Sequence, residues 1–196
     1  MLRRLPVVPT LVVLLAVGIM VRLGFWQLDR MHQKEALLAR YEAAAKDARS
    51  VPFPTDKDEI EQALYRRSEV VCASFGEDMP VGGENSAGIS GWVHRFPCET
   101  FEGFTARLVL GWSIDPAPRH WAYGGRFRGV IAPGGRLVVV DPMLSETFGL
   151  QANARPDPRN IPNNHLSYAV QWFLFAGVAL VIFVLAVRKR LKESVS

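Results

Sequence analysis

The sequence predicts an integral membrane protein, in which two transmembrane α-helices flank a mainly β (α+β) extracytoplasmic domain folded as an antiparallel sheet or small barrel. Of the 196 residues 49% are hydrophobic, and the excess lies in one uncharged segment near each end, residues 5–21 and 168–187. Basic residues flank both segments. Between them, short apolar runs separated by glycine and proline are typical of β-strands.

Each apolar segment is long enough to cross a bilayer. At 1.5 Å per residue, residues 168–187 span about 30 Å, the thickness of a hydrocarbon core. The first segment reaches a similar length if Arg22 extends its charge to the membrane surface and the helix continues to Leu28. We therefore expect transmembrane helices at residues 5–28 and 166–187. The first is expected to remain as an anchor, because its core is long for a signal peptide and no small-residue cleavage site follows it.

The distribution of charge predicts the orientation. The net charge of +4 arises at the membrane flanks, since residues 23–187 carry 16 basic and 18 acidic side chains. This distribution argues against nucleic-acid binding. Short basic tails favour the cytoplasmic side, so both termini, including the tail 188–196, are expected there. Residues 29–165 then lie in the periplasm of a cell with an inner membrane, or in the equivalent compartment of a mitochondrion.

The outer region divides into a helical part and a β-rich part. A juxtamembrane helix is expected at 29–48, followed by a short helix capped by Thr55 or Asp56. The β-rich part is expected over residues 65–141, and a return loop over 142–165. Its predicted strands cover residues 65–75, 88–96, 105–112, 121–131 and 136–141. The breakers expected between them are Gly82-Gly83, Pro97, the Pro116–Pro118 segment and Pro133-Gly134-Gly135, and every Gly-Gly pair is expected to be a turn.

Motifs of familiar enzymes are missing from the sequence, which contains no G-x-S-x-G, P-loop, H-E-x-x-H or G-x-G-x-x-G pattern. We expect a protein without enzymatic activity; an enzyme whose catalytic groups converge from distant positions in the sequence is the alternative that stays open here. Cys72 and Cys98 would both lie outside the cytoplasm, where disulfides persist. A cross-strand bridge, two unpaired thiols and copper ligation all remain open for this pair.

Polar side chains gather where the two apolar segments reach the outer membrane edge. His165 and Tyr168 open the second segment, and Gln27 and Arg30 lie at the matching level of the first. An imidazole at this depth can ligate heme iron, cap the helix or bind a phosphate head group. Arg22 and Arg30 can pair with acidic groups or extend to lipid head groups. His32, His94 and His120 are expected to be structural or solvated. The small residues that could allow close helix contact are Ala16, Gly18, Ala176, Gly177 and Ala179.

The two membrane edges together resemble one known family. Residues 23–30 read LGFWQLDR, similar to a G-x-W-Q-x-x-R motif, and residues 164–173 read NHLSYAVQWF, similar to N-x-H-x-x-Y-A-x-Q-W-F. Tyr65-Arg66-Arg67 and Leu110-Gly111-Trp112 are similar to two further landmarks, Y-R-R and R-G-W. The chain thus resembles, over nearly its whole length, the surfeit-locus-one family of cytochrome c oxidase assembly factors. It departs from the family pattern in lacking the Arg before Gly111 and in carrying Cys72 where a strand glycine is common.

The resemblance implies a function in respiratory chain biogenesis as a chaperone that binds heme a and aids its insertion into subunit I of cytochrome c oxidase. Subunit I and other oxidase assembly factors are the implied partners. His165 is the implied ligand of the heme iron, Trp26 and Trp172 the candidates for stacking on the macrocycle, and Arg22 or Arg30 for pairing its propionates. The full set of candidate cofactor-binding residues is His165, Trp26, Gln27, Arg30, Tyr168, Gln171 and Trp172. One alternative is a cofactor-free assembly scaffold. The other is a membrane-anchored sensor or binding protein, and the short cytoplasmic tails argue against this second alternative.

Overall fold

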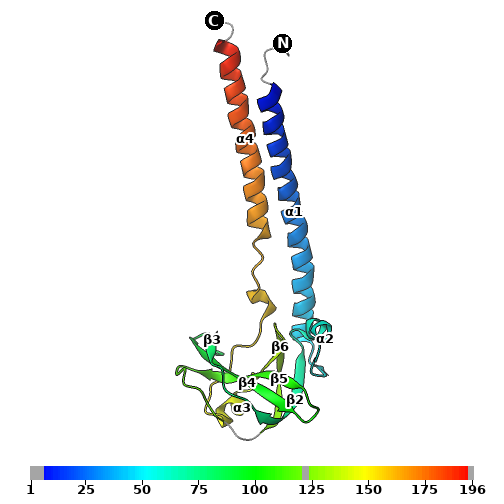
Figure 1. Cartoon of the computed structure of the whole chain (residues 1–196), viewed down its shortest axis with the longest axis vertical. Helices are drawn as coiled ribbons and strands as arrows, with labels where there is room; N and C mark the ends of the chain where they lie inside the picture. Colours follow the sequence, from blue (N-terminus) through cyan, green and yellow to red (C-terminus); the bar gives the residue numbers. More distant parts are fainter. Residues whose placement is uncertain (1–6, 121–123, 194–196) are drawn as a thin grey trace. The chain divides into compact units, whose positions relative to one another are not determined.

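The computed structural model describes residues 7–120 and 124–193 and separates into two compact units (Figure 1). A helical unit comprises the described parts of Met1–Leu37 and Pro162–Ser196, and a β unit comprises those of Leu38–Ile161. The membrane boundaries expected after residues 28 and 165 stay a prediction. The predicted beginnings of the first span at Leu5 and of one strand at Trp121, and the last three residues of the tail, lie outside the described residues.

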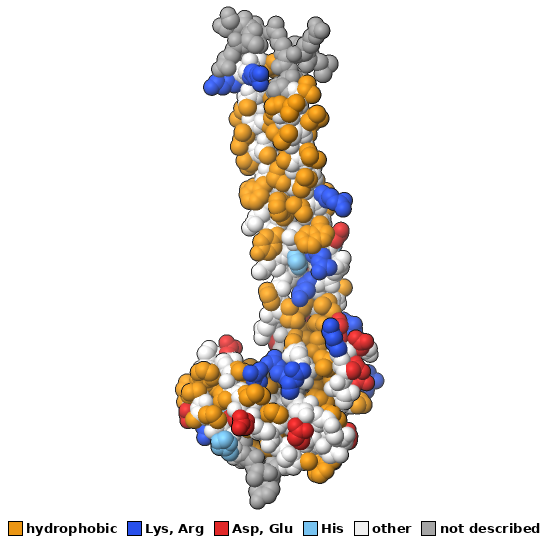
Figure 2. Space-filling view, in the orientation of Figure 1, with side chains coloured by type: hydrophobic (Ala, Val, Ile, Leu, Met, Phe, Trp, Pro, Cys, Tyr) orange, Lys and Arg blue, Asp and Glu red, His pale blue; other side chains and the backbone are white. Residues whose placement is uncertain are grey.

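Two long helices form the helical unit. Helix α1 (Val7–Lys46) has 40 residues and α4 (His165–Glu193) has 29, and within this unit they run antiparallel and side by side (Figure 1). Both are long and apolar enough to cross a membrane. Apolar side chains cover most of their visible surface (Figure 2). Since lipid, unlike water, is a good solvent for such a surface, the two helices fit a membrane protein.

Small residues allow the two helices to approach closely. Gly24 on α1 is buried, and a Cβ at this position would lie 2.6 Å from Cε1 of Phe173 on α4. The ring of Phe173 also contacts Phe25 edge-on at 5.3 Å between ring centroids. On α4, Ala169 and Ala176 are buried on the same seam.

The prediction of which small residues lie between the two helices was only partly right. Ala176 is buried and Ala179 half-buried, but Ala16, Gly18 and Gly177 are exposed. At 100° per residue, Gly18 lies a third of a turn around α1 from Gly24, and it therefore faces away from α4.

Five strands close into a small barrel in the β unit. Neighbouring pairs run from β2 through β6, β7, β5 and β4, and a pairing between β2 and β4 closes the ring. These strands are β2 (Arg67–Phe75), β4 (Ser90–Thr100), β5 (Thr105–Ser113), β6 (Gly125–Ala132) and β7 (Arg136–Val138). All pairs in the ring are antiparallel except β5–β7. The predicted fold class is thus confirmed, and of its two forms the barrel is the one present.

Two short strands extend the barrel, and the sequence did not indicate either. Strand β1 (Ser50–Val51) pairs in parallel with the beginning of β2, and β3 (Val81–Glu84) pairs antiparallel with β4. The interpretation of Gly82-Gly83 as a turn was therefore wrong. Gly83 is needed in the strand because a Cβ there would lie 2.7 Å from Cγ1 of Val93 on β4. Gly125 likewise begins β6, whereas Gly134 and Gly135, both with positive φ, do form the predicted turn.

Pro97 does not break its strand, contrary to expectation, but lies inside β4 opposite Arg107 of β5. Its carbonyl accepts a hydrogen bond from the Gly76 amide at 2.9 Å, on the side away from β5. The proline nitrogen faces that same side, where the chain passes between β2 and β3. The missing N–H therefore costs no bond of the β4–β5 ladder.

Short helices complete the β unit. Helix α2 (Lys57–Ala63) is capped by Asp56, whose carboxylate accepts hydrogen bonds from the amides of Asp58 and Glu59. The segment predicted as a return loop contains helix α3 (Pro142–Thr147) and a 3-10 helix, η2 (Pro158–Asn160). Both elements are too short to show a helical pattern of apolar residues in the sequence.

A disulfide lies at the closure of the barrel. Cys72 on β2 and Cys98 on β4 are bonded, with Cα atoms 5.3 Å apart, and both are buried in the main core. This core also contains Phe96, Leu108 and Ile131. The bridge resolves the alternatives left open by the sequence, because it consumes both sulfurs. It also joins the two strands whose pairing closes the ring.

We expect loss of this bridge to destabilise the β unit. Replacing both cysteines by alanine should lower the free energy of unfolding by about 3 kcal/mol, because the unfolded chain loses a cross-link over a loop of this length. Chemical unfolding of the full chain in detergent measures the change. Reductant should destabilise the wild-type chain and leave the double variant unaffected, and equal stability of both chains without reductant would contradict the assignment.

Candidate functional site

A hydrogen bond between the two membrane helices marks the candidate site. His165 is the first residue of α4, and its Nδ1 lies 2.8 Å from Oε1 of Gln27 on α1. An amide oxygen can only accept, so Nδ1 carries the hydrogen. In the neutral imidazole, Nε2 then holds the lone pair and is the atom able to bind a metal. The contact resembles the arrangement in metal sites, where a second group fixes the tautomer and orientation of a ligating histidine.

Trp172 lies on the same face of α4 as His165. The two residues are seven positions apart, which corresponds to two helical turns and about 10 Å along the axis. Trp172 is half-buried and contacts Phe175 edge-on, with ring centroids 6.3 Å apart. Tyr168 lies between them, one turn from His165, and its side chain is exposed. This face therefore offers an imidazole at the membrane edge and aromatic rings deeper in the apolar region.

The other candidate residues point elsewhere. Arg30 donates from Nη1 to Oε1 of Gln33 on its own helix, at 2.8 Å. Trp26 is exposed and lies about 100° around α1 from Gln27. Gln171 on α4 is exposed too.

Arg22 and Trp26 share a groove on α1. The groove measures about 650 Å³ and is also lined by Phe25 and Asp29. The structure thus brings His165 and Gln27 together and aligns Trp172 with them. It does not bring Trp26, Arg30 or Gln171 into contact with His165.

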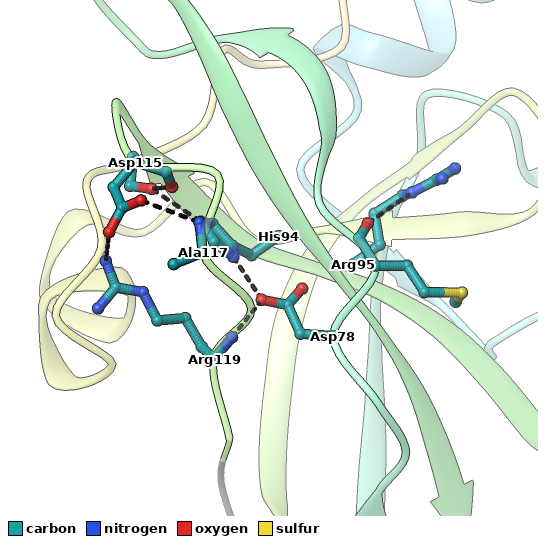
Figure 3. A network of polar contacts seen from close by, with 8 residues as sticks. Asp78, His94, Arg95, Asp115, Ala117 and Arg119 are labelled. Atoms are coloured by element: carbon teal, nitrogen blue, oxygen red, sulfur yellow. Dashed lines mark hydrogen bonds and ion pairs between the residues drawn. The ribbon is translucent and has the colours of Figure 1, made fainter.

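A second polar cluster lies inside the β unit, and no sequence motif indicates it (Figure 3). His94 on β4 is fully buried, with Nδ1 2.5 Å from Oδ2 of Asp78 and Nε2 2.8 Å from Oγ of Ser113. The same Asp78 oxygen accepts the Arg119 amide at 2.8 Å. Ser113 donates its hydroxyl hydrogen to the carbonyl of Asp115.

Counting hydrogens shows how His94 is bonded. A carbonyl only accepts, so the single Ser113 hydrogen points to Asp115 and Ser113 Oγ must accept from Nε2. A second hydrogen lies between Nδ1 and Oδ2 of Asp78, so both ring nitrogens are hydrogen-bonded and His94 and Asp78 form a buried acid–base pair. Although the order Asp–His–Ser is that of a hydrolytic triad, the Ser113 hydroxyl is committed to the backbone rather than to His94.

The buried pair is therefore structural, and it fixes the segment after β5 against β4. This agrees with the expectation that His94 is structural. The inward position of His94 was available from the alternation along β4, where Phe96 and Cys98 share its face. Asp78 could not be found in this way, because it lies in the irregular segment between β2 and β3. His32 and His120 are exposed.

The tyrosine–arginine landmark connects the end of α1 with the beginning of the barrel. Tyr65 is buried against Tyr41, with ring centroids 5.1 Å apart, and has a positive φ of 65°. Arg66 forms an ion pair with Asp47 at 3.0 Å. Hydrogen bonds from the Arg49 side chain and amide hold the pKa of Asp47 well below its usual range. These landmark residues are thus structural within the β unit.

Comparison with known protein families gives one match, and it spans most of the chain. The family model described as the SURF1 family matches residues 14–177. The matched range contains both membrane-edge motifs and the entire barrel. Comparison with curated protein sequences gave no significant match.

The Gln27 contact predicts the tautomer of His165. Gln27→Ala should remove the preference for a hydrogen on Nδ1, because no other acceptor is bonded to that atom among the described residues. Nitrogen-15 chemical shifts of the imidazole in the full chain measure the tautomer. Gln33→Ala, which alters a glutamine on the same helix that bonds only Arg30, is the control. An unchanged tautomer in Gln27→Ala would contradict the role of Gln27.

The buried pair predicts a large effect of His94. His94→Ala should lower the free energy of unfolding by about 3 kcal/mol, because it leaves the Asp78 carboxyl group buried without its ring partner. His120→Ala, at an exposed position of the same unit, should change it by less than about 0.5 kcal/mol. Urea unfolding of the two variants measures the difference, and equal stabilities would contradict a stabilising role of the pair.

Proposed function

Because the chain belongs to the SURF1 family, we propose that it binds heme a through His165 at the outer membrane edge and aids its insertion into subunit I of cytochrome c oxidase. Membership places the chain among proteins of cytochrome c oxidase assembly. Heme a binding, the insertion step and subunit I as partner are the parts that we propose. The hydrogen bond between His165 and Gln27 supports them most directly.

The geometry suits one histidine ligand. Gln27 occupies Nδ1 of His165, so Nε2 is the atom that would bind the iron. Trp172, on the same face two turns deeper, offers an aromatic surface to an apolar macrocycle. Heme a supplies the iron and a large apolar ring. The donor set of this chain therefore fits the group, although Arg30 is bonded to Gln33 rather than directed toward His165.

We propose that the chain holds the cofactor and does not transform it. A carrier must bind well enough to keep an apolar cofactor out of bulk lipid and weakly enough to release it. One histidine ligand meets both needs, because a second protein ligand would slow release. The described residues offer no hydrolytic triad that is free to act, since the Ser113 hydroxyl bonds the backbone.

We place the β unit outside the cytoplasm, in the periplasm or the equivalent mitochondrial compartment. The disulfide Cys72–Cys98 supports this placement, because such bonds persist in oxidising compartments. The last turns of α4 carry Arg188, Lys189, Arg190 and Lys192, and a basic helix end favours the cytoplasmic side. The candidate site at the other end of α4 then lies at the outer edge of the inner membrane.

Complementation in the chain's own host tests the proposal. Deletion of the gene should remove the a-type heme signal from the reduced-minus-oxidised spectrum of the membranes, and the wild-type chain should restore it. His165→Ala should restore the signal at least about tenfold less well, because the axial ligand is lost. His32→Ala, at an exposed position of α1, should restore it fully.

The outcomes of this experiment separate the alternatives. Immunoblots for the chain must show equal amounts of each variant in the membrane. Full restoration by His165→Ala would contradict heme binding through this residue and favour a cofactor-free scaffold. An unchanged a-type signal after deletion, with no second gene copy present, would contradict the function in oxidase assembly of this host.

A further inference from the structure

Three arginines lie together on the outer face of the barrel. They are Arg95 on β4, Arg107 on β5 and Arg136 on β7, which are neighbouring strands. Arg107 is directly opposite Arg136, and Arg95 is two residues along β4 from the partner of Arg107. The residues that follow each arginine, Phe96, Leu108 and Leu137, are buried in the barrel core. Because side chains alternate along a strand, the three arginines point outward together.

No carboxylate compensates these three charges among the described residues. Arg95 and Arg136 donate only to the backbone carbonyls of Met79 and Pro133, at 3.4 and 3.3 Å. Glu99, nearby on β4, directs both carboxylate oxygens to the Thr105 hydroxyl. Burial lowers the pKa of Arg136, and the charges of Arg95 and Arg107 lower it further. Like charges on adjacent strands repel each other, so this cluster lowers the stability of the folded β unit.

Two arginines on another pair of strands are arranged differently. Arg126 and Arg128 on β6 both pair with Glu69 on β2, at 2.5 and 3.0 Å. Among the described residues, Arg95, Arg107 and Arg136 form no such ion pair. Arg67 at the beginning of β2 forms none either, but only the first three lie together on adjacent strands.

A small buried apolar cluster lies next to the three arginines on the same strands. Val109 is opposite Arg95 and next to Val138, and both are buried together with Ala132 in a cluster separate from the main core. Val93 is partly buried against them. The guanidinium groups are therefore the accessible part of this face, and Arg107 is the most exposed of the three. Arginine is enriched at protein interfaces.

We propose that this face, defined by Arg95, Arg107, Arg136 and Val93, docks an acidic surface of subunit I, one that presents Asp and Glu carboxylates. Arginine suits such a partner because its planar fork bonds a carboxylate through two parallel hydrogen bonds. This inference rests on the proposed function, since it takes the client of the assembly factor as the partner. It adds the surface and the chemistry by which the β unit recognises that client.

Co-purification with the client tests the surface. Full-length tagged chain is isolated from host membranes in mild detergent, and subunit I that accompanies it is quantified by immunoblot from low to high salt. Arg107→Glu with Arg136→Glu should reduce co-purified subunit I at least about tenfold at low salt, which corresponds to about 1.4 kcal/mol. It should also weaken the salt dependence, because the steering charges are reversed. Arg126→Glu with Arg128→Glu, an equal change of charge on β6, should retain most of the binding.

Each outcome decides one point. Equal co-purification by wild type and Arg107→Glu/Arg136→Glu would overturn the surface, as would equal losses in both double variants. Co-purification of subunit I with the wild-type chain and with Arg126→Glu/Arg128→Glu, but not with Arg107→Glu/Arg136→Glu, would support the surface. If Arg107→Glu/Arg136→Glu also loses binding to phosphatidylglycerol vesicles to the same extent, the arginine cluster binds lipid and the proposed protein partner is overturned. If the wild-type chain itself carries no subunit I, the proposed function fails, which is distinguishable from failure of the surface. Intact disulfide and unchanged thermal unfolding of each variant establish that it is folded.

Discussion

One polar contact between two apolar helices determines how the membrane-spanning part of the chain is organised. Gln27 and His165 are 138 positions apart in sequence, yet their side chains meet at 2.8 Å. In an apolar environment an unpaired amide or imidazole is costly, so each group favours the helix register that pairs the other. Gly24 makes the approach possible, because only a glycine leaves room for the Phe173 ring. The same contact sets the tautomer of His165 and leaves Nε2 without a hydrogen in the neutral ring.

The β unit has few residues from which to form a stable core. A closed ring leaves only the short edges of β1 and β3 outside the pairing, and the Cys72–Cys98 bridge joins the two strands that complete the ring. The buried His94–Asp78 pair fixes an irregular segment that has no strand partner of its own. Arg95, Arg107 and Arg136 lie together on the outside of this ring.

The sequence predicted the parts of this structure that depend on local pattern. Two uncharged apolar segments predicted the helices, and short apolar runs separated by glycine and proline predicted the five barrel strands, with ends shifted by a few residues. It could not predict the parts that depend on register. Gly82-Gly83 has the composition of a turn but lies in β3, because a neighbouring valine needs the space. Pro97 has the character of a breaker but faces away from β5. At the site, the sequence places Gln27 and His165 at the same level of the membrane edge. Whether their side chains meet, and whether Trp26 and Arg30 point toward them, depends on the rotation of each helix about its axis, which the sequence does not reveal.

The most direct test of the account is the ligation of heme a by the purified chain. The full-length protein in lipid nanodiscs would be titrated with heme a, and the iron–histidine stretch of the ferrous complex recorded by resonance Raman spectroscopy. We predict one histidine-ligated heme per chain, a loss of that stretch in His165→Ala, and an altered stretch in Gln27→Ala, because the hydrogen bond at Nδ1 tunes the ligand. An iron–histidine stretch that is the same in His165→Ala as in the wild type would contradict the central claim.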